Sequence, residues 1–117
     1  MNLNKNSRIY IAGHNGMVGS AVYNLLKKKK YKNIITVSRQ SLDLTNQKKT
    51  ENFLKNTKPN FVIIAAAKVG GILINQKNKA DFIYQNLTIQ NNLIHSSYKA
   101  GVKKLIFLGS SCIYPKF

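Results

Sequence analysis

Residues 8–19 read RIYIAGHNGMVG, and this stretch decides the fold. A short run of β-branched and aromatic residues, Arg8 to Ala12, leads into three glycines at Gly13, Gly16 and Gly19. From the second glycine onward, apolar residues recur at helical spacing: Met17, Val18, Ala21, Val22, Leu25 and Leu26. The pattern predicts a strand, a tight turn and a helix. The helix should end in the run Lys27 to Lys30, where cations suit the negative end of the helix dipole.

Glycines at this spacing, between a strand and a helix, are typical of a dinucleotide-binding turn. They permit the tight turn, let backbone N–H groups approach a pyrophosphate and allow close helix–strand packing, while the helix N-terminus attracts the anion. An ordinary tight turn is the alternative. We expect cofactor contacts from the whole turn, with the His14 side chain either beside a phosphate or facing solvent: Gly13, His14, Asn15, Gly16, Met17, Val18 and Gly19.

Further along the chain, strand-like and helix-like segments alternate. Residues 33–37 (NIITV) and 104–108 (KLIFL) are typical of strands, and 61–66 (FVIIAA) is typical of a strand covered by helices on both faces. We expect one helix from Thr45, as its N-cap, through Lys55, and another from Asp81 to about Tyr98.

The resulting order βαβαβαβ predicts an α/β fold, a Rossmann-type doubly wound parallel sheet truncated after the fourth strand. We expect the spatial strand order 3-2-1-4, with the fourth strand beside the first. Ligands in such sheets bind at the carboxyl ends of strands, where the winding reverses. Gly13 and Ser110 should therefore face one crevice.

Residues after the second strand bear on the choice of cofactor. An NAD-selective site normally offers Asp or Glu about 20 residues beyond the turn, for the ribose 2′-hydroxyl, and none stands there. Ser38 and Arg39 occupy this place, and a guanidinium can pair with a 2′-phosphate. We therefore predict NADP (NADPH) rather than NAD, the alternative being that Arg39 is a solvated surface residue. Asp43 and Leu44 could hold the adenine.

Composition restricts the class of protein further. The 117 residues include 19 Lys or Arg and 3 Asp or Glu, a formal net charge of +16 that could attract nucleic acid or anionic surfaces. Because the lysines are spread along the sequence, we interpret them as a solvated face and expect no nucleic-acid partner. The single Cys112, the polar stretch Met1 to Ser7 and the lack of an apolar run of about 20 residues predict a cytoplasmic protein without membrane contact. No metal site is expected.

Four longer strings carry a resemblance to a family: GHNGMVGSA at 13–21, AAAKVGGI at 65–72, ADFIYQN at 80–86 and LGSSCIYPK at 108–116. From about Arg8 onward the chain resembles the GDP-L-fucose synthase family of extended short-chain dehydrogenase/reductases. The resemblance implies an oxidoreductase and epimerase of nucleotide-sugar metabolism. Its substrate would be GDP-4-keto-6-deoxy-D-mannose, epimerised at two carbons beside the ketone and then reduced by NADPH to GDP-L-fucose. A homodimer is also implied.

The same resemblance implies roles for individual residues. Ser110 would hydrogen-bond the keto oxygen, and Cys112 would exchange protons at the epimerised carbons, tasks that suit a hydroxyl and a thiol. Without the resemblance, Cys112 would be interpreted as a small buried residue. The loop after the third strand would supply further cofactor contacts from Ala65, Ala66, Ala67 and Lys68. Lys68, Val69 and Gly70 would contact either the cofactor or the substrate.

Part of the family pattern is missing. Its catalytic Tyr-x-x-x-Lys pair has no counterpart, since Tyr23 and Lys27 have the spacing but fall in the first helix, off its apolar stripe. Asn15 stands where the family often has arginine. We expect residues 1–117 to be part of an NAD(P)-binding domain without the substrate domain and to be inactive alone. The chain would be either a truncated gene product or one half of a split enzyme completed by a separate C-terminal chain. The alternatives are a non-catalytic NADP(H)-binding module and a fragment of another sugar-nucleotide epimerase or dehydratase.

Overall fold

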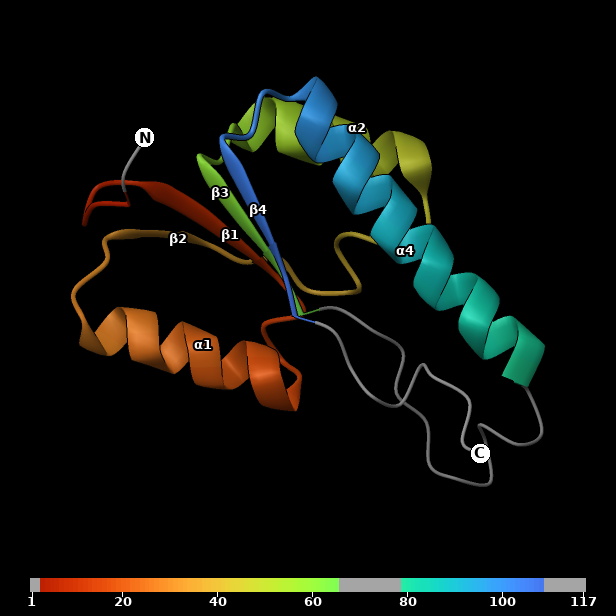
Figure 1. Ribbon diagram of the computed structural model, residues 1–117, viewed down its shortest axis with the longest axis horizontal. Helices are drawn as coiled ribbons and strands as arrows, with labels where there is room; N and C mark the ends of the chain where they lie inside the picture. The colour runs from red at the N-terminus through yellow and green to blue at the C-terminus, as the bar shows by residue number, and fades with distance from the viewer. Residues whose placement is uncertain (1–2, 66–78, 109–117) are drawn as a thin grey trace.

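The computed structural model describes residues 3–65 and 79–108, and these alternate between strand and helix as predicted. The strands, all parallel, are β1 (Arg8–Ala12), β2 (Asn33–Ile35), β3 (Phe61–Ile64) and β4 (Lys104–Phe107). The helices are α1 (Met17–Lys28), α2 (Gln47–Thr57) and α4 (Lys79–Lys99) (Figure 1). No helix among these residues is long and apolar enough to cross a membrane.

The sheet has the strand order β2-β1-β3-β4, so the predicted order 3-2-1-4 is wrong. β3 pairs with β1, from Ile9 opposite Phe61 to Ala12 opposite Ile64, and β4 pairs with β3. The prediction assumed that the third strand extends the sheet beyond β2. Instead residues 36–46 form turns and irregular backbone, and α2 returns the chain to the free side of β1. The winding therefore reverses between β1 and β3.

Helices cover both faces of the sheet, α1 on one and α2 with α4 on the other (Figure 1). Successive strand residues point to opposite faces, so a strand covered on both sides is apolar throughout. Phe61–Ile64 is buried at every position, as the apolar run predicted. The α1 face buries Ile9, Ile11, Leu26, Phe61 and Ile63, and the other face buries Tyr10, Ala12, Leu54, Val62, Ile64, Ile89 and Leu93.

The buried face of α1 differs from the apolar stripe in the sequence. Four residues of α1, at positions i, i+3, i+4 and i+7, face the sheet: Gly19, Val22, Tyr23 and Leu26. Met17, Val18 and Leu25 are exposed instead, and Tyr23, expected off the stripe, packs against the core. Gly19 decides this rotation, because it lets the helix approach the preceding turn closely on that side.

The start of α2 also differs from prediction. Asn46, not Thr45, caps the helix, and its Oδ1 accepts a hydrogen bond from the Lys49 N–H at 3.0 Å. Thr45 is held one residue earlier, since Asp43 Oδ1 accepts from its N–H at 2.9 Å and its hydroxyl at 2.6 Å. This Asx turn places the chain for the cap that follows. The helix ends at Thr57, and Lys58 adopts a left-handed conformation before Pro59.

Candidate nucleotide-binding site

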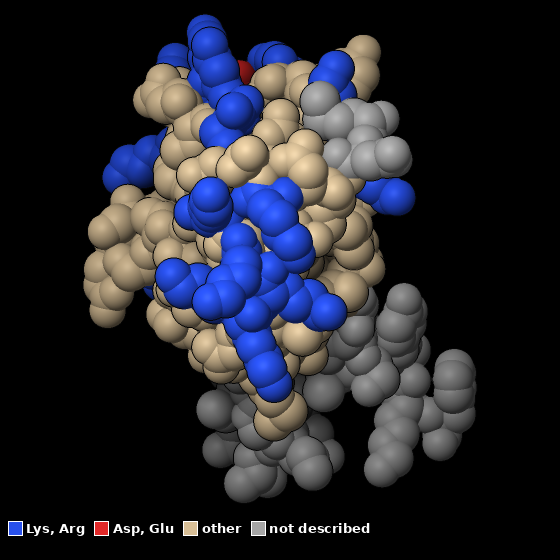
Figure 2. All heavy atoms as spheres, turned by 90° about the vertical axis from the view of Figure 1, so that its left-hand side faces the viewer, with Lys and Arg blue, Asp and Glu red and all other residues tan. Residues whose placement is uncertain are grey.

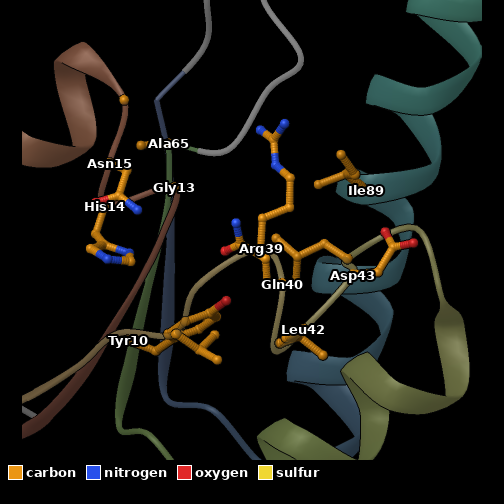
Figure 3. A pocket seen from close by; sticks show the side chains of 13 residues that line it. Tyr10, Gly13, His14, Asn15, Arg39, Gln40, Leu42, Asp43, Ala65 and Ile89 are labelled. Carbon is orange, nitrogen blue, oxygen red and sulfur yellow. The ribbon is translucent and has the colours of Figure 1, made fainter.

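A cleft of about 460 Å³ opens at the carboxyl ends of β1 and β3. It lies where the winding reverses, the position at which open α/β sheets bind ligands. Its volume falls within the range of roughly 300–1,000 Å³ usual for small-molecule sites. Figure 3 shows its lining, which comes from β1, the glycine turn, residues 37–44, the end of β3 and α4: Tyr10, Gly13, His14, Asn15, Gly16, Val37, Arg39, Gln40, Leu42, Asp43, Leu44, Ala65 and Ile89.

The glycine turn forms one wall of this cleft. Gly13 has a φ of +91°, a conformation that L side chains rarely adopt. The Gly16 N–H donates to the Gly13 carbonyl at 3.1 Å, and Gly16 caps α1 without a side chain. The N–H groups of the first helical turn have no acceptor within the helix, and this turn carries no acidic residue. These donors and the helix dipole suit a phosphate.

Gly19 explains how α1 can begin directly above the turn. A Cβ added at this position would lie 1.8 Å from the Gly13 carbonyl oxygen and 2.7 Å from its carbon. Both are backbone atoms and cannot rotate away. Only glycine therefore allows this approach of helix to strand, and the approach aims the first turn of α1 at the cleft.

The opposite part of the cleft is mostly apolar and suits a flat base. Val37, Leu42, Leu44 and Ile89 line it, together with the buried Tyr10. Burial raises the pKa of the Tyr10 hydroxyl well above its ordinary value, so this phenol stays protonated. The Tyr10 ring meets Phe53 edge-on at 5.0 Å, which fixes its orientation.

Charged side chains are concentrated at the mouth of the cleft. The exposed Arg39 extends across the opening between the glycine turn and α4, with Gln40 beside it and Asp43 toward α4 (Figure 3). Asp43 is oriented by its hydrogen bonds with Thr45. The arrangement places a cation at the opening, above an apolar base-binding region and beside an anion-binding turn.

Most of the predicted cofactor contacts come together in this cleft: Gly13, His14, Asn15, Gly16, Arg39, Asp43, Leu44 and Ala65. Met17, Val18 and Gly19 are not among the lining residues, because they form the first turn of α1 and can contribute only backbone groups. Several predicted residues lie outside the part of the chain that the structure describes: Ala66, Ala67, Lys68, Val69, Gly70, Ser110 and Cys112.

Sequence reasoning missed five lining residues: Tyr10, Val37, Gln40, Leu42 and Ile89. Tyr10 could have been found, because it shares a face of β1 with Ala12, two residues on and next to the turn. Val37, Gln40 and Leu42 surround residues that were predicted. Ile89 comes from α4, far along the chain, and nothing near it in the sequence indicates the cleft.

Comparison with known proteins identifies the family of this chain. Residues 9–117 match the model of the NAD dependent epimerase/dehydratase family. The chain belongs to this family. GDP-L-fucose synthase 1 of Arabidopsis thaliana is 54% identical over 113 residues, which cover 97% of this chain and 35% of that protein. The chain thus spans about a third of the length of this relative.

Two solved structures of this kind contain NADP. A GDP-mannoheptose C4 reductase from Campylobacter jejuni, with NADP bound, has a TM-score of 0.90 and 46% identity, covering 97% of this chain and 36% of the other. A GDP-L-fucose synthetase from Naegleria fowleri, also bound to NADP, has a TM-score of 0.83 and 30% identity, covering 100% and 38%. Both structures are thus similar to this chain over nearly its whole length, and both were solved with NADP.

Proposed function

We propose that this chain is the cofactor-binding part of a GDP-L-fucose synthase, with residues 1–117 forming part of its NAD(P)-binding domain. The cleft at the β1/β3 reversal is the observation that carries the proposal, because it joins a phosphate-binding turn, an apolar base region and the cation Arg39. The 54% identity to a plant GDP-L-fucose synthase supports the choice of enzyme. The complete enzyme would act on GDP-4-keto-6-deoxy-D-mannose.

The residues of the cleft fit NADPH part by part. Backbone N–H groups of the turn and of the α1 start would bind the pyrophosphate. The apolar region around Tyr10 would hold the adenine, with Asp43 at its edge, and Arg39 would pair with the ribose 2′-phosphate. NADPH supplies the hydride that reduces a ketone. The protein's part is to orient this cofactor against the nucleotide sugar.

Ser110 and Cys112 remain the proposed catalytic residues. β4 is parallel to β3 and ends at the same edge of the sheet as the cleft, which supports this proposal because both residues follow β4 in the sequence. Ser110 would donate to the keto oxygen, which gains negative charge in both steps. Cys112 would exchange protons with the carbons beside the ketone on one face, and inversion requires a second acid or base on the opposite face, which the remainder of the enzyme would supply. A complementing C-terminal chain would bring the Tyr-x-x-x-Lys pair and the substrate domain. The cytoplasmic location of the protein stays a prediction.

Thermal unfolding of the chain with NADPH and with NADH tests the proposal. Ligand at about 100 times its Kd stabilises a protein by about 2.7 kcal/mol, and each kcal/mol corresponds to a midpoint shift of about 4–8 °C for a domain of this size class. We expect a rise of roughly 10 °C or more with NADPH and a smaller rise with NADH at the same concentration. Equal shifts, or no shift with either, would contradict the assignment of the cleft.

Two alternatives share this cleft. A non-catalytic NADP(H)-binding module would show the same thermal shift, but mixing it with the remainder of a GDP-L-fucose synthase, expressed separately, would restore no turnover. A part of another GDP-sugar enzyme is supported by the 46% identity to a GDP-mannoheptose reductase. Such a part would restore activity on a different keto sugar. The complementation assay, run with both classes of substrate, separates the three.

We also propose a homodimer that forms through α4. Its side chains Ile83, Leu87, Ile94 and Tyr98 follow at intervals of four, seven and four residues, which places them on one helix face. Leu87 is 50% exposed and Tyr98 83%, so this face lies open in the described part of the chain. A two-fold axis beside α4 would bury the face against its own copy.

Replacing Leu87 by lysine should convert a dimer to a monomer in sedimentation equilibrium, because the ammonium would be buried without a partner. Thr88→Lys is the matched control, since Thr88 is partly exposed on the same helix but lies about 100° around the helix axis from Leu87. We expect Thr88→Lys to leave the mass unchanged. A monomeric parent chain, or equal effects of both substitutions, would refute the proposed interface.

A further inference from the structure

Exposed cations gather at the edge of the sheet opposite the cleft. Figure 2 shows Lys and Arg side chains concentrated over the end of the molecule where the strands begin and the helices finish. We define the basic edge as the cations at the strand starts and the adjoining turns, all of them exposed: Lys5, Arg8, Lys30, Lys32, Lys58, Lys103 and Lys104.

Backbone and side-chain contacts join these residues into one row. The Lys32 N–H donates to the Lys5 carbonyl at 3.0 Å, and Arg8 Nε donates to the Lys58 carbonyl at 2.7 Å. Asn60 connects the next strands, because its N–H donates to the Arg8 carbonyl at 2.8 Å and its carbonyl accepts from Lys103 at 2.9 Å. The row crosses the starts of all four strands, roughly 14 Å at about 4.8 Å per strand spacing.

Helix stabilisation explains only some of the cations at this end. Lys27, Lys28, Lys55 and Lys99 lie in the last turns of α1, α2 and α4, where a positive charge is favourable. Lys5, Arg8, Lys32, Lys103 and Lys104 lie at strand starts and in turns instead. Neighbouring strand starts lie about 4.8 Å apart, well within the Debye length of about 10 Å, so like charges at these positions repel one another.

None of the chain's three carboxylates neutralises the basic edge. Asp43 lines the cleft, and Asp81 lies in the first turn of α4, whereas the last turn of α4 adjoins the edge. Glu51 is committed to Lys99, whose Nζ lies 2.9 Å from its Oε1 and whose hydrogen bond lowers the pKa of Glu51. An anionic partner from outside the chain would compensate the row.

We propose that the basic edge binds the phosphodiester backbone of a single-stranded nucleic acid. A row of separate cations matches the repeated charges of such a backbone better than it matches one small anion. Tyr31, half-buried with Lys5 Nζ 4.2 Å above its ring, adds an aromatic surface to the row. Most exposed large apolar side chains lie on α1 and α4 instead, which disfavours a membrane surface as the partner.

This inference departs from the sequence-based interpretation of a diffuse solvated face. Lys5, Lys32, Lys58 and Lys103 stand far apart along the chain, so the basic segment at 27–32 by itself does not indicate the row. The parallel sheet brings them together, because every strand starts at the same edge. Only the fold reveals the row.

Fluorescence anisotropy of a labelled oligo(dT) of about 20 nucleotides, titrated with the full chain at several NaCl concentrations, tests the proposal. The edge variant is Lys32→Gln with Lys103→Gln, and the control is Lys48→Gln with Lys49→Gln, exposed residues in the first turn of α2 that change the net charge equally. The edge variant should weaken binding about 10- to 25-fold near 0.1 M salt and flatten the salt slope by about 1.4, at about 0.7 per phosphate contact. The control should change binding less than about threefold.

Three results would overturn the proposal. Equal losses from both variants would show that net charge alone attracts the strand. Displacement of the oligonucleotide by saturating NADPH would place binding in the cleft. Binding to phosphatidylserine vesicles without binding to oligo(dT) would identify a membrane surface instead. Each measurement uses the same folded chain, whose melting is checked for both variants, so weakened binding cannot be confused with unfolding.

Discussion

Replacing Arg39 by alanine should weaken NADPH binding about 10- to 100-fold and leave NADH binding within about twofold. A guanidinium that pairs with a phosphate contributes about 1.5–3 kcal/mol, and only NADPH carries the 2′-phosphate. Arg39 is exposed at the cleft mouth, so its removal should not disturb the fold. Dissociation constants measured for both cofactors by fluorescence titration give the ratio directly.

Two further variants make the Arg39 result specific. Arg39→Lys keeps the charge but loses the planar fork of donors, so it should recover only part of the NADPH affinity. Gln40→Ala changes a neighbouring cleft residue without changing charge and should affect both cofactors alike. If Arg39→Ala weakened NADPH and NADH equally, Arg39 would act by packing, and the predicted preference for NADP would lose its physical basis.

Local patterns in the sequence predicted the elements of the fold but not their lateral arrangement. The buried strand Phe61–Ile64 and the turn at Gly13 follow from neighbouring residues alone. Strand order depends on which strand edges pair. Parallel strands are joined through helices, and the sequence of a connecting helix does not indicate on which side of the sheet the next strand is added. The predicted order failed because β3 pairs with the free side of β1 and not with β2.

In the candidate site, too, some residues could be predicted from local sequence and others could not. The glycine turn and Arg39 could be predicted because a motif or a spacing marks them. Ile89 could not, because it reaches the cleft through the packing of α4 on the sheet. The basic edge is also a product of topology, since its members come from four separate stretches of the sequence. Function that depends on residues from several strands is therefore visible only once the strands are placed.

Replacing Gly19 by alanine should destabilise the chain more than the same methyl added at Gly16. The new Cβ would lie 1.8 Å from the Gly13 carbonyl oxygen, so α1 would have to move away from β1. Overpacking against immobile atoms typically costs about 1–3 kcal/mol and occasionally more. We expect the melting midpoint to fall by roughly 10 °C or more. The NADPH-induced rise should also shrink, because the displaced first turn of α1 no longer points its N–H groups at the cleft.

Gly16→Ala provides the matched comparison, since it adds the same methyl three residues earlier. Its Cβ would lie 3.5 Å from the same Gly13 oxygen, an ordinary contact, and Gly16 has a φ of −78° that alanine adopts freely. The loss should stay near or below about 1 kcal/mol, the usual effect of alanine at an N-cap. If both variants melted alike, close approach of helix to strand would not be the reason for glycine at position 19. If only Gly19→Ala unfolded early, the glycine turn would be shown to hold α1 in place, in addition to its proposed role in binding phosphate.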